Sequence, residues 1–257
     1  MQSQIPPANG HDGQGAPPPT DRTAWKRMAA RAAVAAVPAG AVLGLGSGST
    51  AELMLEELTA RIRQEGLRVV GVATSERTRQ LAAGLGIPLA ELDDVPQVDM
   101  SIDGADEIAL PALDLVKGRG GALLREKLVA AASGFRVIIV DATKVVQTLA
   151  TAHALPVEVE TFGWQQTARR LVALGGQPQR RMIGPPDASD ASDARPFISD
   201  GGHYVLDCAF APLAEPGLLA AEIKAITGVV DHGLFIGMTD RAYIAGPEGL
   251  VSYDCPR

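Results

Sequence analysis

The sequence predicts an α/β fold: a Rossmann-like, mainly parallel sheet flanked by helices, with a smaller inserted α+β domain of ferredoxin-like type. Apolar, β-branched segments alternate with helix-forming segments in the first half of the chain, which is typical of such sheets. Residues 135–141 are apolar without alternation, as in a parallel strand buried on both faces. Glycine-rich, acidic or lysine-containing segments follow three predicted strands, at 46–50, 103–106 and 141–144, where ligands bind in open α/β sheets.

Each element of this first half has a local signal. The Ala-rich segment that stops at Pro38 predicts a first helix. Ser75, with Thr78 three residues later, predicts the N-cap of another helix, which we expect to end near Gly84 and Gly86. In chain order we expect helix 23–37, strand 41–46, helix 49–64, strand 67–74, helix 76–85, strand 87–92, strand 98–103, helix 122–132 and strand 135–141.

The pattern changes after Lys144, where a small α+β unit is expected. Its predicted elements and the ones that follow are strand 156–161, helix 164–174, strand 177–183, strand 204–210, helix 218–226, strand 229–237 and strand 241–245. We therefore expect the small α+β domain at residues 151–215. The α/β catalytic domain is expected at residues 22–150, completed by 216–257.

Two segments have a biased composition. Residues 1–21 are rich in Pro, Gly and Gln and lack the apolar segment of a signal peptide, so they predict a disordered tail. Residues 184–196 repeat Asp-Ala-Ser without an apolar period, which predicts an exposed loop.

The bulk composition disfavours several classes of protein. A net charge of −7 argues against a nucleic-acid partner, and no apolar run reaches the roughly 18 residues of a membrane span. The two cysteines form no disulfide framework or metal motif, and the four histidines lack metal-ligand spacing. We therefore expect a cytoplasmic protein without a membrane or nucleic-acid partner and without a metal.

Residues 44–50, Gly-Leu-Gly-Ser-Gly-Ser-Thr, join a glycine-rich turn to the start of a helix. The glycine spacing differs from the dinucleotide fingerprint, and the lysine of a P-loop is missing. Free N–H groups and hydroxyls at a helix N-terminus suit an anion or the oxygens of a sugar. A tight turn capped by serine remains the alternative.

Acidic residues follow a predicted strand at Asp103-Gly-Ala-Asp-Glu. The turn at Gly104 allows Asp103 and Asp106 to point at one place, where they could bind hydroxyls and move protons. An Asx turn that satisfies the loop backbone is the alternative. A metal site is disfavoured by the absence of a nearby His or a calcium-loop spacing.

Basic residues and glycines lie together at Lys117-Gly-Arg-Gly-Gly. The glycines around Arg119 allow backbone N–H groups to face a ligand, and Lys117 supplies a cation. Glu126 follows on the next predicted helix, and Lys144 follows the strand that ends at Asp141. Taken singly, a helical Glu and a loop Lys are more often solvated surface residues.

Five motifs in this order resemble ribose-5-phosphate isomerase of type A. They are Gly-Leu-Gly-Ser-Gly-Ser-Thr (44–50), Asp-Gly-Ala-Asp-Glu (103–107), Lys-Gly-Arg-Gly-Gly-Ala-Leu-Leu-Arg-Glu-Lys (117–127), Asp-Ala-Thr-Lys (141–144) and Leu-Pro-Val-Glu-Val (155–159). The resemblance runs from about residue 24 to the C-terminus. It departs from the family at Ser47, where Thr is commoner, in the long 185–196 segment, and at 199–203, where Ser-Asp-Gly-Gly-His replaces Thr-Asp-Asn-Gly-Asn.

The resemblance implies an aldose-ketose isomerase of the non-oxidative pentose phosphate pathway, which interconverts D-ribose 5-phosphate and D-ribulose 5-phosphate through a cis-enediolate without a cofactor. It implies Glu126 as the catalytic base, with Asp103, Asp106 and Lys117 as further catalytic residues. Lys117 would stabilise the enediolate and keep Glu126 ionised. The implied substrate-binding residues are Ser47, Gly48, Ser49, Thr50, Asp103, Gly104, Ala105, Asp106, Lys117, Gly118, Arg119, Gly120 and Lys144.

The partner implied is a small phosphorylated sugar, and we expect a homodimer or a tetramer. Two other functions stay open on the sequence. A regulator that senses sugar phosphates would carry a helix-turn-helix and a basic surface, which this acidic chain lacks. A coenzyme A transferase of related architecture would use Glu126 as a nucleophile but leaves the acidic pair and Lys117 without a role.

Overall fold

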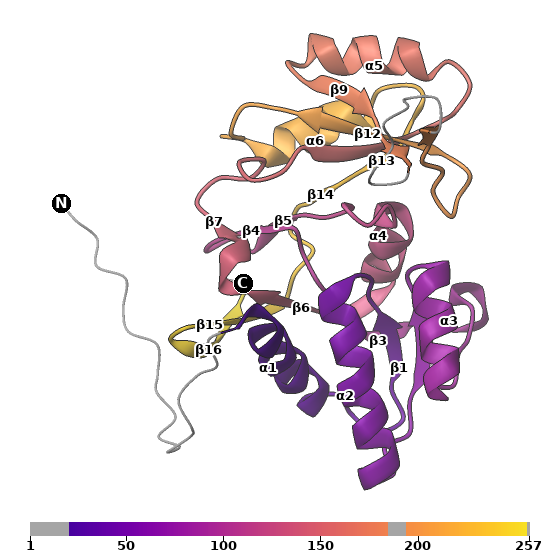
Figure 1. Cartoon of the computed structure of the whole chain (residues 1–257), viewed down its shortest axis with the longest axis vertical. Coiled ribbons are helices and arrows are strands. Elements are labelled where there is room, and N and C mark those ends of the chain that lie inside the picture. Colours follow the sequence, from indigo (N-terminus) through magenta and orange to yellow (C-terminus); the bar gives the residue numbers. More distant parts are fainter. Residues whose placement is uncertain (1–20, 185–193, 256–257) are drawn as a thin grey trace, which may run out of the picture.

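A computed structural model describes residues 21–184 and 194–255 of the chain. The predicted disordered tail lies outside the described residues except for Asp21, and so does most of the predicted exposed loop. The main feature is a six-stranded sheet (Figure 1). Its strands, from edge to edge, are β16 (Gly249–Asp254), β15 (Arg241–Gly246), β6 (Ser133–Asp141), β3 (Val98–Asp103), β1 (Val42–Leu45) and β2 (Val70–Ala73). All neighbours pair in parallel except β16 with β15. The Rossmann-like fold class is therefore confirmed.

Helices cover one face of this sheet. They are α1 (Arg22–Ala35), α2 (Ser49–Glu65) and α3 (Glu76–Leu85). The buried alanines of α1 and the leucines of α2 pack with strand residues such as Leu43, Ile102 and Ile139 in one apolar cluster. Ser75 accepts a hydrogen bond from Thr78 N and caps α3, as predicted. Asp21, which was placed in the predicted tail, accepts one from Ala24 N and caps α1.

The other face is covered by α4 (Leu123–Ala131) and by a second sheet that the sequence did not predict. Its order is β14 (Leu234–Phe235), β5 (Asp114–Val116), β4 (Glu107–Ala109) and β7 (Val145–Val146). These strands have two or three residues each, too few for an alternating pattern to be recognised. They matter because β4 begins at Glu107, the last residue of the acidic motif, and β5 leads directly into Lys117.

A third sheet forms the smaller unit, above the large sheet in Figure 1. Its elements in chain order are β8 (Leu155–Val159), α5 (Trp164–Ala173), β9 (Gln177–Arg180), β12 (Tyr204–Ala209), α6 (Pro216–Lys224) and β13 (Val229–His232). The strand order β13-β8-β12-β9 with antiparallel neighbours is that of a ferredoxin-like βαββαβ unit. The predicted C-terminal limit of the small domain, residue 215, is wrong, because α6 and β13 follow it in the chain and are parts of the same unit.

Three predicted strands differ from the structure. Residues 87–92 form only a bridge from Leu89 to Gly71, followed by a 3₁₀ turn at Leu92–Asp94. The segment 177–183 divides into β9 and β10 (Met182–Ile183), and β10 pairs with β11 (Arg195–Pro196).

The third difference lies at 229–237, which divides at Gly233 into β13 and β14 of two different sheets. Lys117 N donates to the carbonyl of Gly233 at 2.8 Å, and a Cβ on Gly233 would lie 2.2 Å from the Lys117 carbonyl oxygen. Only glycine allows this approach. The break therefore helps to fix the backbone of Lys117.

Candidate active site

The predicted site residues come together where the parallel strands end. A cavity of about 360 Å³ lies between the segments that follow β1, β3 and β5 and the helices α1, α2 and α4. Every predicted substrate-binding or catalytic residue lines it except Asp103. The lining consists of Arg22, Lys26, Ser47, Gly48, Ser49, Thr50, Gly104, Ala105, Asp106, Lys117, Gly118, Arg119, Gly120, Glu126 and Lys144.

Asp103 forms the wall behind the cavity. The last residue of β3, it is 7 % exposed, and its Oδ1 accepts hydrogen bonds from Ser47 N at 3.0 Å and Gly104 N at 2.7 Å. A Cβ on Gly46 would lie 2.2 Å from that Oδ1, so the β1 turn can approach only as glycine. The carboxylate thus ties together the two turns that border the cavity.

Lys117 is buried between carboxylates. Its Nζ lies 2.9 Å from Asp103 Oδ2 and 3.5 Å from Glu126 Oε2, and it donates to the carbonyl of Gly104 at 2.5 Å. Burial by itself would lower the pKa of Lys117, but the negative charges of Asp103 and Glu126 outweigh it, so the pKa lies above its ordinary value. The ammonium group stays charged, with one hydrogen bond to the Gly104 carbonyl and ion pairs to the two carboxylates.

Glu126 projects from α4 into the same cluster and is 6 % exposed. Burial raises the pKa of its carboxyl group well above the ordinary range, Lys117 opposes this rise, and the charges of Asp103 and Asp106 add to it. The expectation that Lys117 keeps Glu126 ionised is therefore only partly correct. The cation lowers the pKa, but burial and a second carboxylate outweigh it. A carboxyl group in this state is poised to exchange a proton near neutral pH.

The other two acids of the motif separate in space. Asp106 is half-buried, lines the cavity and accepts a hydrogen bond from Arg119 N at 3.0 Å. Glu107 is fully buried on β4 and turned away from the cavity lining. Its two oxygens accept hydrogen bonds from the backbone N–H groups of Ala150, Ala152 and His153, so it holds the following loop in place.

Cationic groups gather near the N-terminus of α2. Gly48, with φ of +89°, is the N-cap and carries no side chain that could cover the first N–H groups. Lys26 Nζ donates to the hydroxyl of Ser49 at 2.9 Å, and Arg22 and Lys144 line the cavity beside it. The side chain of Lys144 has no hydrogen-bond or ion-pair partner among the described residues. This region suits a dianionic group.

Arg22 and Lys26 are missing from the sequence-based site. Both lie in the first turns of α1, about 20 residues before the glycine turn, and α1 packs against α2. Their spacing of four places them on one face of a helix, which was the only signal available. Ser47 also differs from expectation. Its hydroxyl is held among those of Thr74, Ser75 and Thr78, at 2.8 to 3.2 Å.

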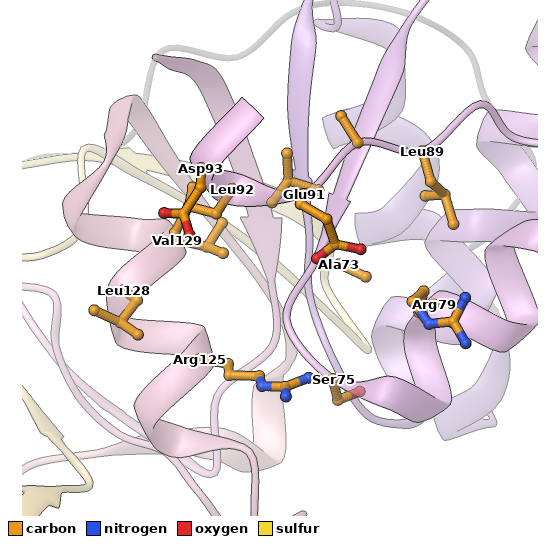
Figure 2. A pocket seen from close by; sticks show the side chains of 12 residues that line it. Ala73, Ser75, Arg79, Leu89, Glu91, Leu92, Asp93, Arg125, Leu128 and Val129 are labelled. Atoms are coloured by element: carbon orange, nitrogen blue, oxygen red, sulfur yellow. The ribbon is translucent and has the colours of Figure 1, made fainter. Parts of the chain in front are cut away.

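A second cavity, of about 300 Å³, lies on the other side of α4 (Figure 2). Arg125 and Leu128 of α4 border it together with Glu91 and Arg79, and none of the predicted site residues lines it. Its walls carry opposite charges beside leucine side chains and no buried titratable cluster. The cavity with Lys117 and Glu126 is therefore the candidate active site.

Comparison with known proteins agrees with this geometry. A sequence model of the family described as ribose 5-phosphate isomerase A (phosphoriboisomerase A) matches residues 70–249. The ribose-5-phosphate isomerase A of Synechococcus sp. (strain JA-3-3Ab) is 50 % identical over 225 residues, which cover 88 % of this chain and 94 % of the relative. The relative from Roseiflexus castenholzii is 51 % identical over 233 residues, with 90 % and 96 % covered. This chain belongs to the ribose 5-phosphate isomerase A family.

Solved structures of the family share the fold. The ribose 5-phosphate isomerase A of Methanocaldococcus jannaschii superposes with a TM-score of 0.82 at 35 % identity, covering 90 % of this chain and 98 % of the other. A ribose-5-phosphate isomerase in complex with phospho-erythronic acid gives a TM-score of 0.85 at 30 % identity, covering 91 % and 100 %. The predicted family and fold class are thus confirmed.

Two features of the described residues bear on other predictions. No helix within 21–184 and 194–255 is long and apolar enough to cross a membrane. In the same ranges no group of three or more His, Cys, Asp or Glu side chains suits a metal ion. The absence of a metal and of a cofactor stays a prediction.

Proposed function

We propose that this protein interconverts D-ribose 5-phosphate and D-ribulose 5-phosphate through a cis-enediolate. One observation carries the proposal: a buried Glu-Lys-Asp cluster and a cation-rich helix N-terminus border the same cavity. The first can move a proton and the second can hold a phosphate. Membership of the ribose 5-phosphate isomerase A family supports the same reaction.

Glu126 serves as the base that carries the proton between C2 and C1. Isomerisation removes a proton from C2 of the open-chain aldose and returns it at C1, and one carboxylate can do both on one face of the enediolate. The buried position and raised pKa of Glu126 support this role, because a base must give the proton back as readily as it takes it. No group from outside the chain is needed for this step.

Lys117 supplies the positive charge beside the reacting atoms. The enediolate is anionic at oxygen, and a fixed ammonium group lowers its energy without reorganisation. Because Lys117 Nζ already contacts Asp103, Glu126 and the Gly104 carbonyl, we assign it an electrostatic role and assign a direct hydrogen bond to the backbone N–H of Gly120. Asp103 orients Lys117 from behind.

Asp106 is our choice for the hydroxyl proton transfer and for opening the sugar ring. It lines the cavity, whereas Asp103 lies behind the wall and is occupied by Lys117 and two backbone N–H groups. A carboxylate that reaches the cavity can exchange a proton with the O1 and O2 hydroxyls.

The phosphate binds at the N-terminus of α2, between Ser49 and Thr50 on one side and Lys26, Arg22 and Lys144 on the other. The remaining substrate contacts fall to Gly48, Gly104, Ala105 and the 118–120 turn. Ser47 contributes through its backbone, since its hydroxyl is engaged elsewhere.

We place the enzyme in the cytoplasm, in the non-oxidative pentose phosphate pathway, without a nucleic-acid partner. We also propose a homodimer or a tetramer. Solvent-exposed apolar side chains support a contact between subunits. Examples are Phe162, which is 91 % exposed, and Val172, which is 56 % exposed. Sedimentation equilibrium of the full chain tests the assembly, and a monomer at micromolar concentration would contradict it.

The reaction is tested by incubating the full chain with ribose 5-phosphate in EDTA, with no cofactor added, and following ribulose 5-phosphate. We expect turnover under these conditions. A protein that is inactive until one divalent ion is returned would contradict the cofactor-free mechanism. A protein that is inactive in both conditions would contradict the function.

A further inference from the structure

The side chain of Arg181 joins the smaller unit to the active-site turn by hydrogen bonds. Arg181 follows β9, which belongs to the ferredoxin-like sheet, whereas the turn at residues 117–121 belongs to the unit that carries the cavity. Arg181 Nη1 donates to the carbonyl oxygens of Gly118 and Arg119, at 3.0 Å each. One guanidinium nitrogen thus holds two consecutive carbonyl groups of the turn.

The guanidinium group is itself held rigidly. Its Nε donates to Asp207 Oδ2 at 2.9 Å and its Nη2 to Asp207 Oδ1, so the fork is bidentate. The Arg181 side chain is 14 % exposed, and its Cζ lies 5.6 Å from the ring centre of Phe197. The same ring touches the turn, because a Cβ on Gly121 would lie 2.2 Å from Phe197 Cζ.

The direction of these carbonyl groups decides where the N–H groups point. The peptide bonds of the turn are trans, so each N–H points opposite to the carbonyl of the preceding residue. Because the Gly118 carbonyl accepts a hydrogen bond from Arg181, the N–H of Arg119 points in the opposite direction, to Asp106, to which it donates at 3.0 Å. Because the Arg119 carbonyl accepts a hydrogen bond from Arg181, the N–H of Gly120 points away from Arg181.

Gly120 lines the cavity, and its N–H has no acceptor among the described residues. A turn rotated the other way would present the carbonyl oxygens of residues 118 and 119 to an anionic ligand and repel it. The end residues of the turn, Gly118 and Gly121, both have positive φ, and Gly121 N donates to the Gly118 carbonyl at 2.9 Å. The Arg119 carbonyl takes no part in that bond, and its hydrogen-bond donor is Arg181.

We propose that Arg181 is a positioning residue, which fixes the peptide groups of residues 118–120 so that amide donors, not carbonyl oxygens, face the anionic substrate. The inference rests on the proposed isomerase function. It gives the smaller unit a direct part in the reaction, although none of the described side chains of that unit lines the cavity.

The test compares Arg181→Ala with Arg180→Ala in the full chain, using ribose 5-phosphate. Arg180 is the matched control, because its guanidinium stacks over the rings of Trp164 and Tyr204, at 4.8 and 5.1 Å, and does not reach the turn.

We expect Arg181→Ala to lower kcat/KM about 10- to 100-fold, mostly through kcat, since a misplacement of about 1 Å has that effect. Added methylguanidinium should restore activity to Arg181→Ala several-fold and leave the wild type unchanged. Arg180→Ala should stay within about twofold of the wild type.

A merely structural role would give other results. Equal losses in the two alanine variants, or a loss in Arg181→Ala that methylguanidinium does not relieve, would overturn the proposal. So would a folded Arg181→Ala with wild-type kcat and KM. Arg181→Lys covers the case in which Arg181→Ala does not fold. Arg181 makes four hydrogen bonds, two to Asp207 and two to the carbonyls, which the three donors of an ammonium group cannot reproduce. We therefore expect kcat to fall in this variant too, and wild-type kcat would contradict the inference. An inactive wild type would defeat the proposed function and this inference with it, whereas an active wild type with an unaffected variant defeats this inference alone.

Discussion

The ammonium group of Lys117 lies 3.5 Å from Oε2 of Glu126, in a site where each of the two residues is less than a tenth exposed. Asp103 is the third member of the cluster, 2.9 Å from the same ammonium group. One cation therefore faces two carboxyl groups, and burial, together with the charge of Asp103, raises the pKa of Glu126 although Lys117 opposes the rise.

Replacing Lys117 tests this balance. Lys117→Met leaves two buried carboxyl groups without a cation, so we expect the free energy of unfolding to fall by about 3–5 kcal/mol and kcat to fall sharply. Lys144→Met is the control, because Lys144 lines the same cavity without a described partner. It should raise KM and leave stability nearly unchanged. Urea unfolding and steady-state kinetics measure both, and an unchanged kcat in folded Lys117→Met would reject the electrostatic role.

The raised pKa of Glu126 has a consequence for stability. A carboxyl group whose pKa is higher in the folded than in the unfolded protein favours folding at low pH, and this contribution is lost as the pH rises through the folded-state pKa. Glu126→Gln cannot ionise and escapes the loss. We expect its stability relative to the wild type to increase by about 1–3 kcal/mol from pH 6 to pH 9 in urea unfolding. A decrease over that range would contradict the burial argument.

The two aspartates should differ in what their loss changes. Asp106→Asn should lower kcat about 100-fold or more with a melting temperature close to that of the wild type, because Asp106 is half-buried and faces the cavity. Asp103→Asn should lower the melting temperature, since it turns an amide toward the buried Lys117 ammonium. If Asp103→Asn lowered kcat at an unchanged melting temperature and Asp106→Asn lowered the melting temperature, the roles that we assign to the two aspartates would have to be exchanged.

The phosphate site is tested with a substrate that lacks the phosphate. Lys26→Ala should raise KM for ribose 5-phosphate about 10- to 100-fold, the value of one charged hydrogen bond. Its kcat/KM for D-ribose should equal that of the wild type, because D-ribose has no group for Lys26 to hold. An equal loss on both sugars would mean that Lys26 supports the fold of the α1–α2 contact and not the phosphate.

Much of the fold was predictable because its signals are local. Five of the six strands of the large sheet lie in segments that the sequence predicts as strands, and Ser75 and the glycines after the strands mark helix starts and turns. The mostly exposed edge strand β16 was not predicted. The short strands β4, β5 and β7 gave no such signal, because two or three residues cannot show an alternation. β14 lies within the predicted strand 229–237, but its place in a different sheet from β13 was not predicted. The pairing of these short strands depends on contacts between distant segments, such as the Lys117–Gly233 hydrogen bond.

The site was predictable to the extent that its groups lie within motifs. Glu126, Lys117 and Asp106 meet as expected. Arg22 and Lys26 come from a helix that reaches the cavity only through its packing against α2. The pKa direction of Glu126 depends on burial and on the sum of three neighbouring charges, and neither can be read from motif spacing.

The central claim is that Glu126 carries the proton between C2 and C1, and Glu126→Gln tests it most directly. The amide keeps the shape of the side chain but cannot accept the proton. In a steady-state assay with ribose 5-phosphate at saturating concentration, we expect kcat to fall by about 10²–10⁴-fold or more, with the circular dichroism spectrum unchanged. A pure, folded Glu126→Gln enzyme with near-normal kcat would contradict the account.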